Sequence, residues 1–238
     1  MQSALRLLYP PQCVCCGDQV ESEFGLCGAC WRDTPFIEGV VCDLCGAPLL
    51  GEDDHHVSHC DDCLKTDRRW AHGRSALQYR DNARRMVLAL KHGDRTDLAR
   101  PAAGWMVRAI APVLPQNALI VPIPIHWTRL LKRRFNQAAE LGRALSDRLD
   151  LEFAPDLLIR PRRTSVHDGL SAEERFDNMK GAIKPHPKRQ HTLSGRHILL
   201  VDDVMTSGAT FSAGADACLD AGAASVTVLS LARVAKEP

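Results

Sequence analysis

The segment from residue 198 to residue 210 constrains the fold and the chemistry of this chain more than any other stretch. It reads ILLVDDVMTSGAT: an apolar run, two adjacent acids, and then a loop of small and hydroxylated residues. The apolar run is typical of a buried strand, and the loop is typical of a helix start. A helix N-terminus offers backbone N–H groups and a dipole that favours anions. The segment therefore predicts a strand followed by a phosphate-binding loop.

The two halves of this segment suit the two ends of a phosphorylated sugar. Asp202 and Asp203 are placed to hold the diol of a ribose. The residues suited to a phosphate are Thr206, Ser207, Gly208, Ala209 and Thr210. The alternative is an ordinary strand, turn and capped helix, but that structure has no need for paired acids before such a loop.

The cysteines mark a second unit near the N-terminus. Nine of the ten lie before residue 64, and eight of these form four C-x-x-C pairs. Two such pairs provide four thiolates, which suit a tetrahedral zinc ion. The simplest assignment uses consecutive pairs. The first zinc would then take Cys13, Cys16, Cys27 and Cys30, and the second would take Cys42, Cys45, Cys60 and Cys63.

Other arrangements of these cysteines stay open. A cross-braced arrangement would interleave the pairs, and one of His55, His56 and His59 could replace a thiolate of the second site. Disulfides and a redox C-x-x-C are disfavoured, because nothing indicates export and because a redox motif needs only one pair. Residues 43–62 hold six acids and no lysine or arginine, so this loop is a poor surface for nucleic acid. With little apolar material of its own, the module should need metal to fold.

Length and composition fit one sizeable domain and a small one. The chain has 238 residues and a formal net charge of +1, so it lacks the overall basic character of many nucleic-acid-binding proteins. No run approaches the roughly 18 apolar residues of a membrane span. Met1–Leu8 is too short for the core of a signal peptide and has no cleavage pattern. We therefore expect a cytoplasmic protein.

Beyond residue 70, apolar periodicity predicts strands that alternate with helices. The predicted strands cover residues 75–79, 118–123, 157–160, 197–201 and 225–231. The predicted helices run from Asp81 to Gly93, from Leu98 to Ala109, around residues 138–145, and between the last two strands. Residues 129–134 are predicted to form a basic loop, and residues 161–192 a long polar loop.

This alternation implies a mostly parallel sheet with helices on its faces. Ligands of such sheets bind at the carboxyl edge of the strands, which is where the loop after Asp203 is expected to lie. In the last helix, Phe211, Ala215 and Cys218 share one face, so Cys218 is expected to be a small buried residue.

Residues 198–210 resemble the 5-phosphoribosyl-1-pyrophosphate (PRPP) binding motif of the type I phosphoribosyltransferases. The whole chain is similar to the ComF family of competence-related proteins, which join a double zinc ribbon to a phosphoribosyltransferase-type domain. Four further blocks carry this similarity: residues 7–13, residues 79–94, residues 121–137 and residues 164–182. Arg134 stands where the family has glycine, His167 where it has glutamine, and Ile183 where it has phenylalanine.

This resemblance implies an α/β fold of the type I phosphoribosyltransferase kind in residues 74–238, with a mostly parallel sheet and flanking helices. Residues 1–70 would form a double zinc ribbon with two structural zinc ions. PRPP and Mg²⁺ would bind at residues 202–210, with Asp202 and Asp203 as catalytic residues. The pyrophosphate needs cations, and the candidates are Lys91, Arg129, Lys132, Arg133 and Arg134. Residues 161–183 could form a lid over the site.

The resemblance also implies a role in the cytoplasmic uptake or processing of exogenous single-stranded DNA. Single-stranded DNA and DNA-uptake proteins would then be partners. The alternative is a phosphoribosyltransferase salvage enzyme with an unidentified acceptor, although the sequence has no recognisable base-binding hood. A PRPP-sensing regulator is disfavoured, because the sequence shows no helix-turn-helix.

Overall fold

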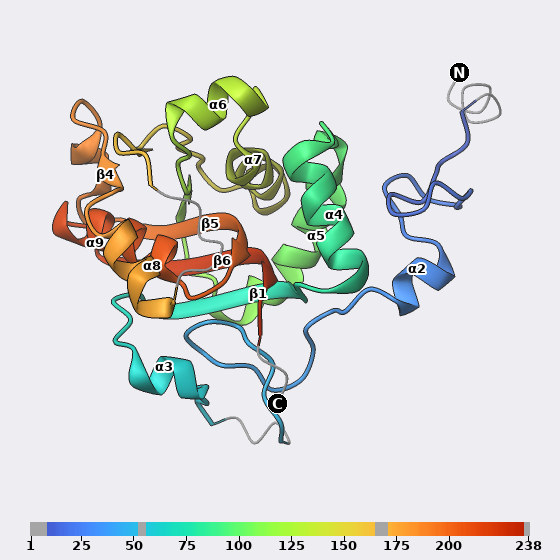
Figure 1. The fold of residues 1–238 in the computed structure, drawn as a ribbon, viewed down its shortest axis with the longest axis horizontal. Helices are drawn as coiled ribbons and strands as arrows, with labels where there is room; N and C mark the ends of the chain where they lie inside the picture. The colour runs from blue at the N-terminus through green and yellow to red at the C-terminus, as the bar shows by residue number, and fades with distance from the viewer. Residues whose placement is uncertain (1–8, 52–55, 165–170, 236–238) are drawn as a thin grey trace.

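The computed structural model describes residues 9–51, 56–164 and 171–235 (Figure 1). Its centre is a four-stranded sheet in the order β1-β6-β5-β2, in which all neighbouring strands are parallel. These strands are β1 (His72–Gln78), β2 (Leu119–Pro122), β5 (His197–Met205) and β6 (Ser225–Arg233). Strands β3 (Leu158–Ile159) and β4 (Lys184–Pro185) form a separate antiparallel pair.

Helices cover both faces of the four-stranded sheet. One face is covered by α4 (Asp81–His92), α5 (Ala99–Ile110) and α7 (Gln137–Leu149), and the other by α8 (Ala172–Met179) and α9 (Ala209–Asp220). Alternate residues of β5 join different apolar clusters, since Leu199 packs with α5 and α7 while Leu200 packs with α9. A strand that is buried on both faces requires a continuous apolar run. Among the described residues, no helix combines the length and the apolar character that crossing a membrane requires.

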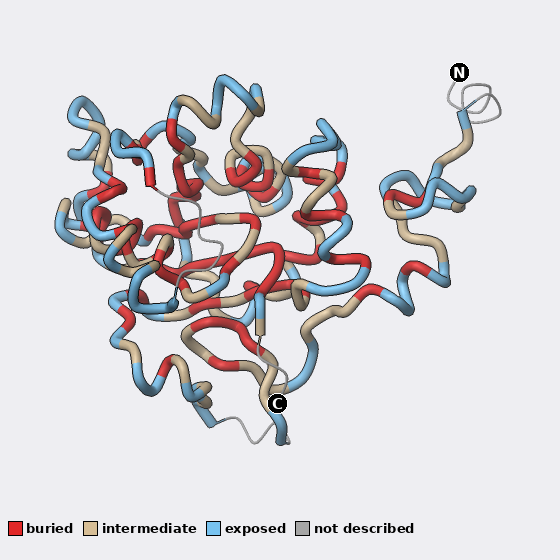
Figure 2. Tube along the Cα trace, in the orientation of Figure 1, coloured by how far each residue is buried: buried red, intermediate tan, exposed pale blue. Residues whose placement is uncertain are grey.

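The first cysteine module lies beside α4 and α5, at the blue end of the chain (Figure 1). It contains the short helix α2 (Gly28–Arg32). Val14 belongs to the apolar cluster of α4 and α5, and the side chain of Asn82 donates to the carbonyl oxygen of Cys30 at 3.4 Å. Much of the module is exposed (Figure 2).

The second cysteine module is part of the core on the opposite face. It contains α3 (Asp61–Lys65), and the backbone N–H of Gly73 in β1 donates to the carbonyl oxygen of Asp43 at 2.8 Å. Cys42 and Cys45 are fully buried within the same apolar cluster as α9. The second module is therefore part of the packed core, whereas the first lies beside the helices and is largely exposed.

Most of the predicted elements are confirmed. The five predicted strands correspond to β1, β2, β3, β5 and β6. The helix predicted from Asp81 ends at His92 with Gly93 as its C-cap, and Cys218 is fully buried. The α/β class, with a parallel sheet and flanking helices, is confirmed together with the N-terminal cysteine modules.

The long polar loop expected over residues 161–192 is wrong for the part that the structure describes. Ser171 and Glu174 form a capping box that starts α8, with bonds of 3.2 and 2.6 Å between side chain and backbone. Met179, Ala182 and Ile183 are buried, and a 3₁₀ helix follows at Gln190–Leu193. Serine followed three residues later by glutamate is a helix-start signal, and the proline-dotted composition obscured it. Residues 165–170 of the suggested lid, His167 included, lie outside the described residues.

Two other local expectations need correction. Residues 129–133 belong to helix α6 (Trp127–Arg133) rather than to a loop, because the ring of His126 caps its start by accepting from the backbone N–H of Thr128 at 3.3 Å. Strand β5 continues to Met205 because β6 pairs with it that far, so the two acids lie inside the strand. The remaining short elements are the 3₁₀ helices Thr96–Leu98 and Ala111–Val113.

Candidate functional site

The acid pair lies near the carboxyl end of β5. Asp203 is 7% exposed, and its carboxylate forms an ion pair with the ammonium of Lys91 at 3.0 Å. Lys91 comes from the last turn of α4, so the fold joins two segments that the sequence places far apart. Asp202 accepts a hydrogen bond from the backbone N–H of Asp203 at 2.8 Å. Burial, with a further contribution from the charge of Asp203, raises the pKa of Asp202 to about 7.

The loop expected to bind phosphate lies directly after these acids. Gly208 has a φ of +84°, in the left-handed region that favours glycine, and it is the N-cap of the 12-residue helix α9. The hydroxyl of Ser207 accepts from the backbone N–H of Ala209 at 3.4 Å. Thr206 is exposed, and Thr210 lies in the first turn of α9. The five predicted residues thus form a turn at a helix N-terminus, which is a favourable place for an anion.

Two arginines that sequence reasoning missed hold this loop in place. Arg233, at the end of β6, donates to the carbonyl oxygens of Met205 at 3.3 Å and Thr206 at 2.6 Å, and it lies 3.7 Å from the sulfur of Cys45. Arg68, between α3 and β1, donates to the carbonyl oxygen of Ser207 at 2.9 Å. The loop is therefore attached to the second cysteine module through Arg233 and to the linker after that module through Arg68. The only sequence signal was the position of Arg233 at the end of an apolar strand. Nothing in the sequence indicated a role for Arg68.

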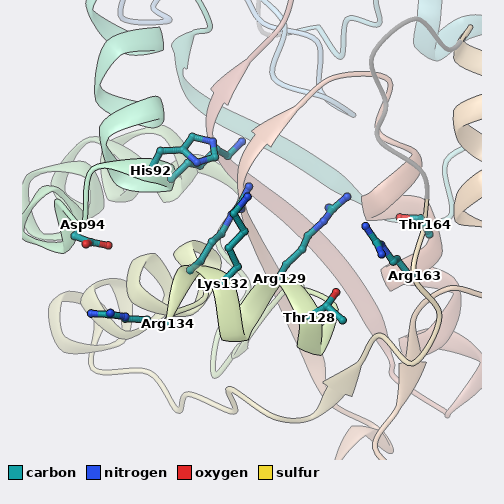
Figure 3. A pocket seen from close by; sticks show the side chains of 10 residues that line it. His92, Asp94, Thr128, Arg129, Lys132, Arg134, Arg163 and Thr164 are labelled. Carbon is teal, nitrogen blue, oxygen red and sulfur yellow. The ribbon is translucent and has the colours of Figure 1, made fainter.

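A basic cavity of about 790 Å³ lies next to the acid pair. Figure 3 shows Arg129 and Lys132 of α6 pointing into it. Arg134 and Arg163 lie on opposite sides of the labelled side chains. The full lining is Lys91, His92, Asp94, Thr128, Arg129, Lys132, Arg133, Arg134, Arg163 and Thr164. Residues 206–210 do not line this cavity. Lys91 lines the cavity and also pairs with Asp203, so the cavity and the acid pair adjoin.

Arg160 connects the acid pair with the wall of the cavity. It follows β3, is 8% exposed, and donates to the hydroxyl of Thr164 and to the sulfur of Met179. Burial lowers the pKa of Arg160 to about 10, with a further contribution from Arg129 and an opposing one from Asp202. Burial also lowers the pKa of Arg129. The basic side chains can bind the negative charge of a ligand, and the two acids beside them can bind the cation that accompanies it.

The unusual residue at position 134 has a structural explanation. Arg134 is the C-cap of α6 and has a φ of +68°, which glycine adopts without strain and other residues adopt at a cost. The glycine of the resembled family at this position therefore matches a backbone requirement.

We expect Arg134→Gly to raise the free energy of unfolding by about 1 kcal/mol, because it relieves left-handed strain at a helix end. Denaturant unfolding followed by circular dichroism measures the change. The matched control is Arg133→Gly, inside the last turn of α6, which should lower the free energy of unfolding by about 1 kcal/mol. Equal destabilisation by both variants would contradict this explanation.

The cysteines form two sets of four, and the pairing is consecutive. The sulfurs of Cys13, Cys16, Cys27 and Cys30 lie within 4.8 Å of one another, as do those of Cys42, Cys45, Cys60 and Cys63. One sulfur pair in each set is 3.6 Å apart, close to the ~3.8 Å edge of a tetrahedron of thiolates around zinc. The cross-braced alternative is therefore wrong. Neither His56 nor His59 joins a set among the described residues, and His55 lies outside them.

Comparison with known proteins agrees with these features. Residues 4–64 match the double zinc ribbon domain family. The chain is 28% identical to DNA utilization protein YhgH of Escherichia coli over 88% of this chain and 91% of that protein. It is 26% identical to competence protein F of Haemophilus influenzae over 93% and 96%, and 26% identical to competence protein ComFC of Bacillus subtilis over 87% and 84%.

Solved structures match a smaller part of the chain. Adenine phosphoribosyltransferase from Thermoanaerobacter pseudethanolicus matches 59% of this chain and 82% of that chain, with 16% identity and a TM-score of 0.36. Phosphoribosylpyrophosphate synthetase from Mycobacterium smegmatis matches 59% of this chain and 34% of that chain, with 12% identity and a TM-score of 0.33.

The chain is thus an α/β protein with a parallel sheet and two N-terminal tetracysteine sites of the zinc-ribbon kind. Its similarity to competence protein F, ComFC and YhgH extends over most of its length. The expected resemblance to the ComF family is thus confirmed over most of the chain.

Proposed function

We propose that this protein binds PRPP, or a related phosphorylated sugar, with Mg²⁺ at the acid pair and the loop of residues 206–210. The observation that carries the proposal is the arrangement around β5. Asp203 pairs with Lys91 at the border of the basic cavity, and a loop at the N-terminus of α9 follows two residues later. PRPP presents groups in the matching order, since its diol lies between a 5-phosphate and a pyrophosphate.

Each part of the site then has a task. The backbone N–H groups of residues 206–210 bind the 5-phosphate, and the ionised acids accept hydrogen bonds from the diol. Lys91, Arg129, Lys132 and Arg133 bind the pyrophosphate and stabilise the charge that it gains on leaving. Arg134, the fifth candidate, would contribute only at the rim. Bound Mg²⁺ supplies further charge neutralisation. The contribution of the chain to a phosphoribosyl transfer would be to position the ligand.

The proposed cellular role is the uptake or processing of exogenous single-stranded DNA in the cytoplasm, together with DNA-uptake proteins. Support comes from relatives that are named DNA utilization protein and competence protein. The basic side chains around the cavity also suit a phosphate backbone.

Calorimetry with three ligands tests the binding proposal: PRPP with Mg²⁺, PRPP without Mg²⁺, and a short single-stranded DNA. We expect Mg-PRPP to bind more tightly than PRPP alone. Protein that binds the DNA but no form of PRPP would contradict the proposal. Measuring pyrophosphate release with and without DNA then separates a binding protein from an enzyme.

A deletion strain tests the cellular role. We expect it to lose the use of exogenous DNA without requiring a nucleotide base for growth. A strain that uses DNA normally but requires a purine or a pyrimidine would contradict this role and favour a salvage enzyme.

The affinity for Mg-PRPP is expected to depend on pH through Asp202. The pKa of this carboxyl is raised to about 7, and only the ionised form accepts hydrogen bonds from the diol without competing as a donor. Between pH 6 and pH 8 its ionised fraction rises about tenfold, so the dissociation constant should fall by about that factor. The same raised pKa means that the free energy of unfolding falls as pH rises from about 4 to 7.

The control for this pH dependence is Asp202→Asn, which keeps the shape of the side chain but does not titrate. Subtracting its profile removes the titration of the ligand. An identical pH profile for the wild type and Asp202→Asn would show that another group is responsible.

A further inference from the structure

Arg68 lies over the loop of residues 206–210, although it comes from the linker that follows the second cysteine module. Its side chain is 9% exposed and donates to the carbonyl oxygen of Ser207 at 2.9 Å. A Cβ added at Gly208 would lie 2.7 Å from one terminal nitrogen of Arg68. The absence of a side chain at Gly208 therefore lets a guanidinium group approach the N-terminus of α9.

The charge of Arg68 has no counter-ion within the described residues. Its Nε and one terminal nitrogen are buried without a hydrogen-bond partner, and no carboxylate pairs with it in that part of the chain. The Cζ atom of the guanidinium lies over two aromatic rings, 5.1 Å from the ring centroid of Trp70 and 5.4 Å from that of Phe176. Burying an uncompensated cation is costly, so a bound anion would stabilise the charge of Arg68.

Two independent features thus favour an anion at the same place. One is the N-terminus of the 12-residue helix α9, and the other is the unpartnered guanidinium of Arg68. Building on the PRPP proposal above, we propose that Arg68 is a direct ligand of the phosphate at this loop, and that the loop selects a terminal phosphomonoester over a phosphodiester.

The preference for a terminal phosphate follows from charge and from enclosure. A phosphomonoester carries close to two negative charges at neutral pH and has three free oxygens, whereas an internal phosphodiester carries one charge and has two. The ring of Trp70 would lie 3.4 Å from a Cβ at Gly208, so Trp70 and Arg68 together cover one side of the loop. The part of a phosphodiester that continues beyond the phosphate would collide with Trp70 and Arg68, whereas a terminal phosphate would not.

Calorimetry with ribose 5-phosphate and with PRPP tests the role of Arg68. We expect Arg68→Met to weaken the binding of both ligands by about tenfold or more, because a charge-assisted contact is lost. Arg68→Lys should recover part of the loss, since it keeps the charge but not the planar group. The matched control is Arg69→Met: Arg69 is exposed and pairs with Asp216 and Asp220, so its loss should change affinity by about twofold or less.

Selectivity is measured on the wild type, so it does not depend on the folding of a variant. We expect ribose 5-phosphate to bind at least about tenfold more tightly than its methyl phosphodiester. Equal binding of the two esters, or unchanged affinity in a folded Arg68→Met protein, would overturn this inference. Those outcomes differ from failure of the PRPP proposal, in which the wild type binds neither PRPP nor ribose 5-phosphate.

Discussion

Replacing Cys42 by serine is expected to abolish the cooperative thermal unfolding of the sheet and to lower the zinc content from two ions per chain to one. Cys42 is fully buried in the apolar cluster that also contains α9. A structural zinc site contributes about 10–16 kcal/mol in small zinc-finger peptides, which is comparable to the ~5–15 kcal/mol stability of a whole domain. Loss of this site therefore removes support from the core. Metal analysis and calorimetric unfolding measure the two effects.

Cys16→Ser is the matched control, because it removes one exposed thiol from the first set. This variant should also hold one zinc, yet its main unfolding transition should move by only a few degrees. The difference arises because much of the first module is exposed, whereas Cys42 and Cys45 of the second are fully buried in the core. A Cys42→Ser protein with the transition of the wild type would show that the second site does not support the core.

Changing Asp202 and Asp203 together to asparagine is expected to weaken Mg-PRPP binding by about 2–4 kcal/mol, or about 30- to 1,000-fold. Asparagine keeps the shape of both side chains, so the loss reports on the two charges. The change also leaves Lys91 without its partner at 3.0 Å, which adds to the effect. Calorimetry on the double variant measures this loss of binding free energy directly.

The control for this prediction is the double change of Asp216 and Asp220 to asparagine. These two acids lie on α9 and form exposed ion pairs with Arg69, so they match the number and type of substitutions outside the proposed site. Their loss should leave the affinity almost unchanged. If both double variants bind as the wild type does, the acids of β5 do not hold the ribose.

Most of the fold could be predicted because local patterns determine it. The apolar run before Asp202 indicated a buried strand, and the spacing of the cysteines indicated two metal sites. The capping box at Ser171 was also local, and it could have been recognised. Position 134 shows the reverse case, in which a departure from a family pattern is explained only when the backbone is known to be left-handed there.

The contacts that organise the candidate site could not be predicted in this way. Arg68 and Ser207 are separated by 139 residues, and Arg233 and Cys45 by 188. No periodicity or motif brings such residues together, because their proximity results from the packing of the second cysteine module against the sheet. Burial of that module in the core has the same origin, since its sequence alone is polar and poor in apolar residues.

The most direct test of the central claim is a crystal structure of the protein grown with Mg²⁺ and PRPP. We expect the 5-phosphate within about 3 Å of backbone N–H groups of residues 207–210 and of the guanidinium of Arg68. The ribose diol should lie on Asp202 and Asp203, and the pyrophosphate should extend toward Lys91. A ligand whose phosphates lie only in the basic cavity, with no group at residues 207–210, would contradict the account.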